Sequence, residues 1–503
     1  MLMQKTNLWL LLTLLLVVGC SDNDNDSNNG NKEPDNQNSN EILVAETGSL
    51  QFQPEDFLNV LFNGELVNRE DSERSKNVSP TITSLLGGVA KLLDIAFGNF
   101  IDAHTPALDK LFEAEAGLDK QEDHCWQMES YSFNYRSKSA RGEDVVLSGR
   151  VTFPNHKTKG IGHQVKSLTL NIHHALPLKW MPSKALGMWT LRSYFNEAVI
   201  EPDGQGLGAN LDKDYYCTVS SNVLARQMAD CTLAALEVMR QHGVTLSDDG
   251  HSICTSCSLG AAVPLAFAKY YETEASASFR QTVRLNAVYT GCGPVDFEGC
   301  IRYYSDHPTF NAMLSKTMLF SLAALSPEQL YGYQAQDFVH PDLLNTQAEY
   351  EGSTMSYYEA EAKYFVNVFG TKEDLPSPKK LSEIIAPDML GQDGKLDDTN
   401  PKTQALMRIL AEQNDLSGWL PTTEIYLIHG KQDDAIPREV SRKCYEALSN
   451  GGMMPNVHYH EIWTPPVLSE LAKLPKAGIM HLITTLSFLV PYLNEDPSQE
   501  LKD

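Results

Sequence analysis

The stretch Ser256-Cys257-Ser258-Leu259-Gly260 separates a short apolar run, HSICTS, from a longer run of helical character, LGAAVPLAFAKYY. We predict a strand before this stretch and a helix after it, with Ser258 in the tight turn between them. Such a turn exposes the serine hydroxyl at the end of the strand, where the backbone N–H of Leu259 can face a developing oxyanion. The pattern Ser-x-Ser-x-Gly also arises by chance, and the alternative interpretation is a simple turn.

A second segment, TEIYLIHGKQDDAIP, places acidic residues directly after another predicted strand, with Ile436-Pro437 beginning the next helix. At the carboxyl end of a parallel strand a carboxylate points into a crevice, where it can orient a histidine. The spacing favours Asp433, and Asp434 is then solvated or caps the helix. The alternative is a pair of ordinary turn aspartates.

A serine hydroxyl is a weak nucleophile, so it needs a base to take its proton and an acid to orient that base. His481 opens the last apolar helical segment, GIMHLITTLSFLVPYL, and we predict that it is the base. His458 and His460 share one face of the predicted strand VHYHEIW and are the competing candidates. Their position in the middle of a strand favours His481.

The first residues have the pattern of an export signal. Lys5 precedes an apolar run from Leu8 to Val18, which is too short to span a bilayer and is followed by Gly19 and Cys20. Residues 1–19 are therefore predicted to be a signal peptide, and residues 20–47 a disordered tether, because residues 21–40 contain almost no apolar side chains. Val17-Val18-Gly19-Cys20 resembles the lipobox of bacterial lipoproteins, and the acidic start of the tail resembles surface-export signals of Bacteroidetes lipoproteins. That resemblance implies lipidation at Cys20, attachment to the outer membrane and display at the cell surface; the alternative is an ordinary signal peptide.

Composition narrows the range of partners. The net charge is −25, and the chain has no basic cluster, which argues against nucleic acid as a partner. Of nine cysteines, eight remain after Cys20. Cys292 and Cys300 are candidates for a disulfide, as are Cys217 and Cys231, although buried thiols are the alternative. Cys254 and Cys257 lack a second ligand pair, so we predict neither a metal site nor any cofactor.

From residue 125 onward, predicted strands alternate with predicted helices, which indicates an α/β fold with a mostly parallel, doubly wound sheet. WQMESYSFNYRS and EDVVLSGRVTF, joined by KSARG, form a predicted antiparallel hairpin. Two regions interrupt the alternation. The chain is accordingly divided into a helical N-terminal extension over 48–124, a core over 125–294, a helical lid insertion over 295–421 and the rest of the core over 422–503.

From about Tyr131 to Leu493, the chain resembles exported α/β-hydrolases of the secretory lipase and esterase type. The segments that carry the resemblance are SGRVTFP, EPDGQGLG, CSLGAAVPLAFAKYYE, YTGCGP and HGKQDDAIP. The resemblance implies that Ser258 is the nucleophile, Asp433 the triad acid and His481 the base. Backbone N–H groups of Leu259 and of His174 or Ala175 would form the oxyanion hole.

The sequence departs from these relatives at four points. Ser256 replaces the first glycine of the elbow, and His173-His174-Ala175 replaces a glycine-containing oxyanion loop. Gly204 stands where the relatives have tyrosine, and Pro264 is expected to kink the helix after Ser258.

The resemblance implies a serine hydrolase that cleaves carboxylic esters of small molecules or lipids through an acyl-enzyme intermediate. A serine peptidase related to prolyl oligopeptidases, or a catalytically decayed surface binding protein on the same fold, is the alternative. The aromatic residues of the lid are expected to form its core in preference to lining an acyl pocket (Tyr303, Tyr304, Phe310, Phe320, Tyr357 and Tyr358). The oligomeric state is left open.

Overall fold

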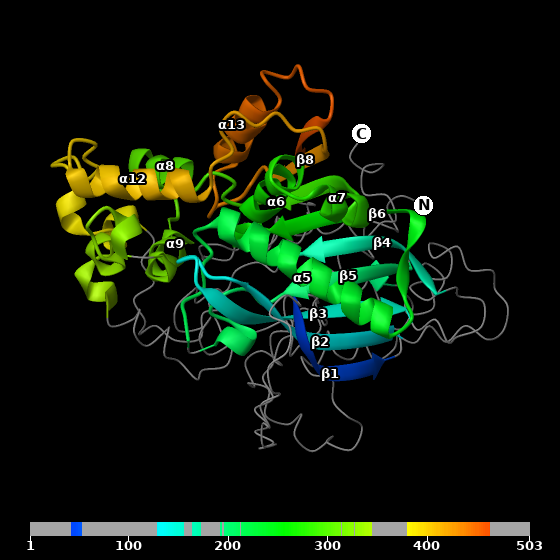
Figure 1. Ribbon diagram of the computed structural model, residues 1–503. Coiled ribbons are helices and arrows are strands. Elements are labelled where there is room, and N and C mark those ends of the chain that lie inside the picture. The colour runs from blue at the N-terminus through cyan, green and yellow to red at the C-terminus, as the bar shows by residue number, and fades with distance from the viewer. Residues whose placement is uncertain are drawn as a thin grey trace, which may run out of the picture.

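The computed structural model describes residues 42–52, 128–154, 163–172, 192–193, 196–211, 213–312, 314–325, 327–344 and 380–462. Their centre is a nine-stranded sheet in the order β1-β2-β3-β5-β4-β6-β7-β8-β9 (Figure 1). The strands are β1 (Leu43–Phe52), β2 (Met128–Lys138), β3 (Asp144–Pro154), β4 (Gln164–Asn171), β5 (Glu197–Pro202), β6 (Thr245–Cys257), β7 (Leu285–Gly291), β8 (Glu424–Gly430) and β9 (Val457–Ile462).

The sheet combines an antiparallel edge with a parallel body. Strands β1, β2, β3 and β5 pair antiparallel, whereas the strands from β5 through β9 in the sheet order pair parallel. The predicted hairpin is confirmed as β2 and β3, joined by a turn in which Gly142 has a φ of +78°. The mostly parallel sheet is confirmed as well. Strands β6 and β8, which precede Ser258 and Asp433, both belong to the parallel part, so their carboxyl ends lie at the same edge of the sheet.

The structure differs from the prediction at its first described residues. The sequence predicted a tether to residue 47 and a helical extension from residue 48, but Leu43–Phe52 forms strand β1 on the open edge of β2. An exposed sheet edge offers unpaired N–H and C=O groups, which a passing segment can satisfy. Residues 53–124, the rest of the predicted extension, lie outside the described residues.

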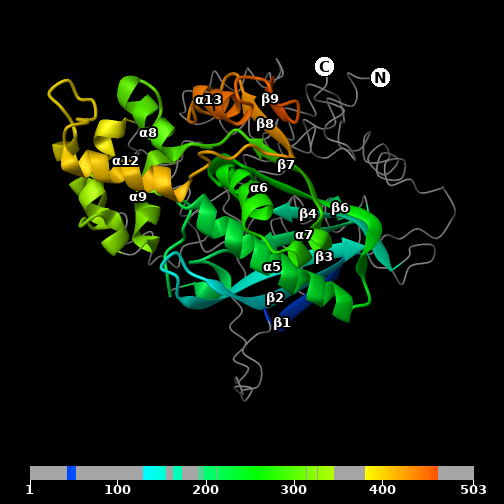
Figure 2. The same cartoon turned by 45° about the horizontal axis from the view of Figure 1, so that its top comes forward.

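Two helices cover one face of the sheet. Figures 1 and 2 show α5 (Ser221–Gln241) and α6 (Ala262–Thr273) side by side across the strands. The shorter helix α7 (Ala277–Val283) leads into β7. The predicted helix over residues 219–242 is confirmed as α5, whose side chain at the N-cap, Ser220, accepts a hydrogen bond from the N–H of Val223.

Pro264 does not interrupt α6. The helix begins at Ala262, so Pro264 lies in its first turn, where backbone N–H groups have no intrahelical acceptor. Proline is tolerated there because it removes no helical hydrogen bond. The prediction of a kink at Pro264 was therefore wrong. The predicted helix began at Leu259, but Ser258–Gly260 forms a 3-10 turn and α6 begins only at Ala262.

The predicted insertion leaves the sheet after β7 and returns at β8. Among its described residues, the helices are α8 (Phe297–Asp306), α9 (Leu314–Phe320) and α12 (Pro401–Gln413), together with short 3-10 turns. Figures 1 and 2 both show these helices gathered at one end of the sheet. Their aromatic residues Tyr304 and Phe320 are buried, and Tyr303 packs against Phe310, so these rings belong to the core of the insertion. Tyr357 and Tyr358 lie outside the described residues.

Glu272 near the end of α6 anchors the chain where the insertion returns to the sheet. Its carboxylate accepts hydrogen bonds from Trp419 Nε1 at 2.8 Å, from the N–H groups of Thr422 at 2.9 Å and Thr423 at 2.8 Å, and from Thr423 Oγ1 at 2.8 Å. One side chain thus satisfies four donors, and removing it leaves them without their acceptor.

Glu272→Ala is therefore expected to lower the free energy of unfolding by about 2–3 kcal/mol. Urea unfolding followed by circular dichroism measures the change. Glu274→Ala is the matched control, because Glu274 lies in the same turn and makes an exposed ion pair with Arg226. The control should cost less than about 1 kcal/mol. Equal changes in the free energy of unfolding for the two substitutions would show that the four hydrogen bonds of Glu272 add no more stability than the exposed ion pair of Glu274.

The disulfide predictions are wrong. Cys292 and Cys300 are both buried and carry unbridged thiols, as do Cys217 and Cys231. Cys292 follows the last residue of β7, whereas Cys300 lies on the buried side of α8. Burial raises the pKa of the Cys300 thiol well above its usual range, which keeps it protonated. These cysteines act as small apolar core residues.

Among the described helices, none combines the length and the apolar character needed to cross a bilayer.

Candidate active site

Ser258 lies in a sharp turn between β6 and α6, as predicted. Cys257 ends the strand in an extended conformation, and Ser258 then adopts a φ of +52°. This left-handed conformation is unfavourable for a residue with a Cβ and occurs where surrounding structure enforces it. Cys257 and Leu259 are buried, whereas Ser258 is only half-buried. The turn therefore brings the serine toward the surface at the carboxyl end of β6.

Gly293 allows a second segment to pass against this turn. A Cβ atom on Gly293 would lie 2.1 Å from the carbonyl oxygen of Ser258 and 2.1 Å from the Cβ of Ala261. The neighbouring strand is tied to the same turn, because Thr290 Oγ1 donates to the carbonyl of Ala261 at 2.6 Å. Only glycine fits at position 293, and the close approach holds the conformation of Ser258.

Asp433 lies in the loop after β8, three residues beyond Gly430. Its Oδ1 accepts hydrogen bonds from the N–H groups of Ala435 at 3.0 Å and Ile436 at 2.9 Å. Only 1% of its side chain is exposed, and its Oδ2 lies 3.5 Å from Nε2 of His429. The loop therefore holds the carboxylate in one orientation, which is what the acid of a triad requires.

His429 belongs to the support of this loop and is itself fully buried. Its Nε2 lies 3.1 Å from the carbonyl oxygen of Ile436, so that nitrogen carries the proton and donates. Its Nδ1 lies 2.8 Å from Ser441 Oγ on α13 (Arg438–Leu448), and the two atoms form a hydrogen bond. Both ring nitrogens of His429 are therefore hydrogen-bonded, and the side chain stabilises the loop between β8 and α13 that carries Asp433.

The insertion also contacts the loop between β8 and α13 that carries Asp433. Tyr304 of α8 is buried, and its hydroxyl donates to the carbonyl oxygen of Ala435 at 2.6 Å. Ala435 is also the residue whose N–H binds Asp433. The position of the acid therefore depends on the insertion as well as on the sheet.

The sheet register relates the strand ends that precede Ser258 and Asp433. Cys257 of β6 is level with Gly291 of β7, which is level with Ile428 of β8. Two strand spacings of about 4.8 Å separate β6 from β8, so the two backbones lie about 10 Å apart at this edge. The turn with Ser258 and the loop with Asp433 therefore leave the sheet at the same edge, two strands apart.

The structure thus assembles Ser258, Leu259 and Asp433 at one edge of the sheet. His481, His174 and Ala175 lie outside the described residues, as does Cys20, so their predicted roles stay predictions.

The competing histidines of β9 face other partners. His458 Nε2 lies 2.9 Å from Glu424 Oε2, at the first residue of β8 and so at the end opposite Asp433. Both His458 and His460 stack with Tyr426, at ring-centroid distances of 4.6 Å and 6.4 Å. Burial and the neighbouring His458 lower the pKa of His460. These contacts disfavour either residue as the base.

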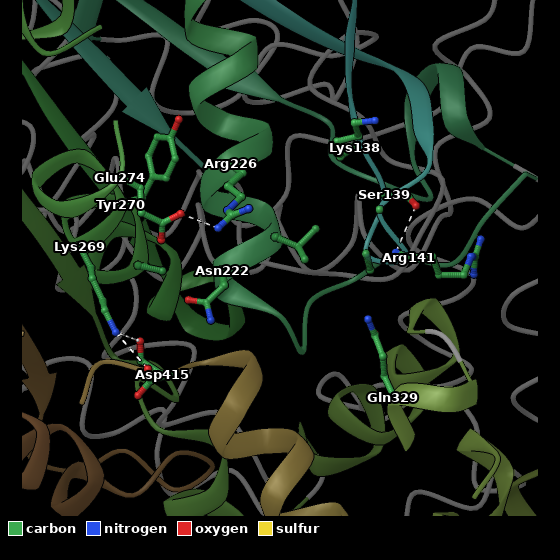
Figure 3. A pocket seen from close by; sticks show the side chains of 14 residues that line it. Lys138, Ser139, Arg141, Asn222, Arg226, Lys269, Tyr270, Glu274, Gln329 and Asp415 are labelled. Carbon is green, nitrogen blue, oxygen red and sulfur yellow. Dashed lines mark hydrogen bonds and ion pairs between the residues drawn. The ribbon is translucent and has the colours of Figure 1, made fainter. Parts of the chain in front are cut away.

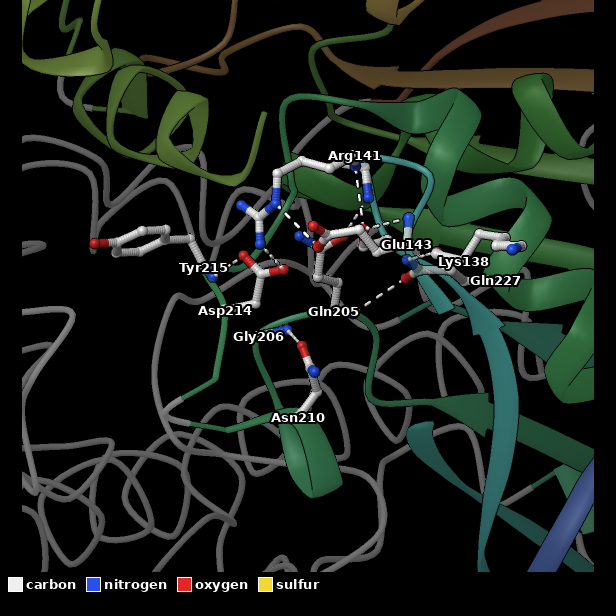
Figure 4. A network of polar contacts seen from close by, with 11 residues as sticks. Lys138, Arg141, Glu143, Gln205, Gly206, Asn210, Asp214, Tyr215 and Gln227 are labelled. Carbon is white, nitrogen blue, oxygen red and sulfur yellow. Dashed lines mark hydrogen bonds and ion pairs between the residues drawn. The ribbon is translucent and has the colours of Figure 1, made fainter. Parts of the chain in front are cut away.

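The loop over residues 203–210 carries a motif singled out in the sequence. Gly204 has a φ of +84°, a left-handed backbone conformation that favours glycine. A Cβ on Gly206 would lie 2.3 Å from the backbone nitrogen of Tyr216. Gln205 Oε1 accepts a hydrogen bond from the N–H of Ala140 in the β2–β3 turn at 2.7 Å. Figure 4 shows the neighbouring contacts: Gln205 N–H to Gln227 Oε1 of α5 (3.1 Å), Gly206 N–H to Asn210 Oδ1 within the loop (2.8 Å) and Arg141 Nη2 of the turn to Asp214 Oδ2 (2.7 Å). The loop is a rigid support next to β5.

A groove of about 480 Å³ opens beside this turn, between the start of α5 and the second half of α6 (Figure 3). Neither Ser258 nor Asp433 is among its described lining residues. Its cations are paired with carboxylates: Lys138 with Asp144, Arg141 with Asp214, Arg226 with Glu274 and Lys269 with Asp415. The groove is therefore separate from the candidate active site.

Sequence reasoning missed a buried carboxyl group below that site. Glu201 of β5 is fully buried, and Asn171 Nδ2 of β4 donates to its Oε1 at 3.0 Å. Burial raises the pKa of Glu201 to about 7, against a smaller lowering by the Asn171 hydrogen bond and by Arg150. The only signal in the sequence was a glutamate inside the apolar run NEAVIEP.

This raised pKa predicts a pH-dependent stability. Because the folded protein retains the proton at pH values where the unfolded chain has released it, stability is full below about pH 4.5 and falls as pH rises to about 7. The free energy of unfolding should fall by about 3 kcal/mol over this pH range. Glu201→Gln keeps the acceptor for Asn171 and carries no titratable group, so it should remove this part of the pH dependence. Urea unfolding at pH 5 and pH 8 compares the two proteins, with exposed Glu143→Gln as control. Parallel pH profiles of wild type and Glu201→Gln would contradict the assignment.

Comparison with known proteins gives the class of fold. The sequence matches no family profile and no curated protein. Among solved structures, it is similar to the rice cell wall degrading esterase LipA of Xanthomonas oryzae, with a TM-score of 0.59 and 17% identity over 78% of this chain and 95% of that one. It is also similar to a hydrolase candidate from Legionella pneumophila, with a TM-score of 0.55 and 17% identity over 78% and 96% of the two chains. The parallel sheet, the serine turn and these likenesses define an α/β-hydrolase fold.

Proposed function

We propose that the protein is a serine hydrolase that cleaves carboxylic esters. The observation that carries the proposal is Ser258, a half-buried serine held at a φ of +52° at the carboxyl end of β6. Asp433 follows β8 two strands away and is oriented by its own loop. The esterase LipA, to which the fold is similar, supports the choice of ester over other substrates.

The mechanism follows from these positions. His481 takes the proton from Ser258 as the hydroxyl oxygen attacks the acyl carbon, and Asp433 stabilises the resulting imidazolium. The N–H of Leu259, together with one from His174 or Ala175, donates to the oxyanion. Collapse of the tetrahedral intermediate expels the alcohol, which takes its proton from His481. Water activated by the same histidine then hydrolyses the acyl-enzyme.

Two reactions test the proposal. A fluorophosphonate probe should label the purified protein at Ser258, which peptide mass spectrometry identifies. A panel of p-nitrophenyl esters should be hydrolysed, and a parallel panel of peptide anilides should not. Labelling without ester hydrolysis but with anilide cleavage would indicate a peptidase, and no labelling at all would indicate a binding protein that has lost its chemistry.

We also propose that the enzyme is exported and held at the outer membrane by a lipid on Cys20. The lipobox-like segment before Cys20 and the polar residues after it support this proposal. Cys20→Ser should abolish incorporation of labelled palmitate and move the protein from the membrane fraction to the soluble fraction. Cys444→Ser is the matched cysteine control and should change neither. Membrane retention of Cys20→Ser would contradict the anchor.

A further inference from the structure

One short segment at the start of the insertion contacts both halves of the candidate site. It leaves β7 after Gly291 and runs through Cys292 and Gly293 into helix α8. Strand β7 lies between β6 and β8 in the sheet. The segment therefore begins between the strand that precedes Ser258 and the strand that precedes Asp433.

The backbone of this segment is fixed on both sides before α8 begins. On the side of β6, a Cβ at Gly293 would lie 2.1 Å from the carbonyl oxygen of Ser258, so the two backbones pass close together. On the side of β8, the N–H of Cys292 donates to the carbonyl oxygen of Ile428 at 2.8 Å, which extends the pairing of β7 with β8 past Gly291. The start of the insertion is thereby tied to the serine turn and to the strand of the acid.

Helix α8 then reaches the loop that carries Asp433, the acid loop, through one buried hydroxyl. Tyr304 is fully buried, and its Oη donates to the carbonyl oxygen of Ala435 at 2.6 Å. Burial raises the pKa of Tyr304 well above its usual range, so the hydroxyl keeps its proton and remains a donor. The ring of Phe310 stacks on that of Tyr304 at a centroid distance of 6.0 Å, which restricts the direction of the hydroxyl.

The peptide group after Ala435 transmits this contact to the carboxylate. The N–H of Ile436 donates to Asp433 Oδ1 at 2.9 Å, and the N–H of Ala435 donates to the same oxygen at 3.0 Å. The carbonyl of Ala435 and the N–H of Ile436 belong to one planar peptide unit, so a bond that holds the carbonyl also holds the direction of that N–H. The Tyr304 hydroxyl therefore fixes one of the two donors that orient the acid.

We propose that Tyr304 is a positioning residue, which holds the orientation of Asp433 from the first helix of the insertion. The inference rests on the proposed ester hydrolysis and deepens it. The acid of a triad acts by orienting the base and stabilising its charge, so a carboxylate that turns away loses both effects. Because the segment before α8 also packs against the turn of Ser258, one piece of chain sets the nucleophile and the acid relative to each other.

Tyr304→Phe tests the proposal on the full-length protein, because it removes the hydroxyl and retains the buried ring. We expect kcat for a p-nitrophenyl ester to fall about 10-fold with KM changed less than about twofold, since the orientation of the acid serves the transition state. The rate constant for inactivation by a fluorophosphonate should fall by a similar factor. An unchanged kcat, or a change confined to KM, would overturn the proposal.

The double variant Tyr304→Phe/Asp433→Asn separates positioning of the acid from a general structural effect. If Tyr304 acts through the carboxylate, its hydroxyl should matter less than about twofold once the carboxylate is gone, because effects that share one interaction are not additive. The inactivation rate constant is the readout, since it stays measurable when turnover is slow. A further loss of about 10-fold on top of Asp433→Asn would show that Tyr304 acts elsewhere and would refute the positioning role.

Tyr271→Phe is the matched control. Tyr271 of α6 also donates its hydroxyl to a backbone carbonyl, that of Arg280 at 3.1 Å, and accepts from the N–H of Leu285 at 3.2 Å. Leu285 is the first residue of β7, so this contact lies at the opposite end of the strand from Gly291. The control should lower the melting temperature while leaving kcat unchanged. Equal losses of kcat in the two tyrosine variants would contradict a specific role of Tyr304.

The failure of the function and the failure of this inference are distinguishable. A wild-type protein that neither reacts with fluorophosphonate nor hydrolyses esters refutes the esterase, and the positioning role with it. A wild-type protein that does both, next to an unimpaired Tyr304→Phe, refutes the positioning role alone.

Discussion

Ser258→Ala should abolish ester hydrolysis, with a fall in kcat of about 10⁶-fold. The substitution removes the oxygen that attacks the acyl carbon, and nothing else in the described site can replace it. Folding should be preserved, because alanine meets the same backbone demands and the turn is held from outside by Gly293 and Thr290. Steady-state rates with p-nitrophenyl esters and labelling by fluorophosphonate measure the effect.

Ser278→Ala is the control for this substitution. Ser278 is an exposed serine on α7, and its removal should change neither the rate nor the melting temperature. Undiminished hydrolysis in Ser258→Ala would refute the assignment of the nucleophile. A loss of hydrolysis accompanied by unfolding would instead show that the turn depends on the serine hydroxyl.

Asp433→Asn should lower kcat about 10⁴-fold. Asparagine retains an oxygen that can accept from the N–H groups of Ala435 and Ile436, so the loop should keep its shape. It loses the negative charge that stabilises an imidazolium and orients the base. The protein should therefore still fold, and its reaction with fluorophosphonate should become slow.

The neighbouring Asp434 provides the discriminating control. Asp434→Asn removes the same charge one residue further along the loop and should reduce kcat less than threefold. A larger loss in Asp434→Asn than in Asp433→Asn would transfer the role of the acid to Asp434. Equal small effects in both variants would remove the loop from the mechanism altogether.

The strands and helices around the elbow were predictable because each carries a local signal. Alternation of apolar and polar residues predicted β2 and β3, and helical spacing of apolar residues predicted α5. Short apolar runs predicted β6, β7 and β8. Strand β1 was missed, because Leu43–Phe52 follows a long polar tail and its apolar residues lie at its two ends without regular alternation. It forms a strand because the edge of β2 offers it hydrogen bonds, which is a tertiary effect.

The state of the cysteines likewise could not be predicted from local sequence patterns. Cys292 and Cys300 are eight positions apart in the sequence, and this spacing suggested a bridge. Whether two thiols form a disulfide depends on the distance between their backbones and on the directions of their side chains. The sequence does not show either quantity for one cysteine after a strand and another within a helix. In the structure both thiols are separate parts of the apolar core.

The sequence by itself determined the class of fold and the position along the chain of Ser258 and Asp433, because the turns that carry them follow from apolar spacing, small residues and glycine. Only the tertiary structure decided what supports them. The contacts of Ser256 with Ile172, of Gly293 with the elbow and of Tyr304 with the acid loop join segments up to 131 positions apart. Such pairings depend on strand order and register, and no local pattern of residues specifies those.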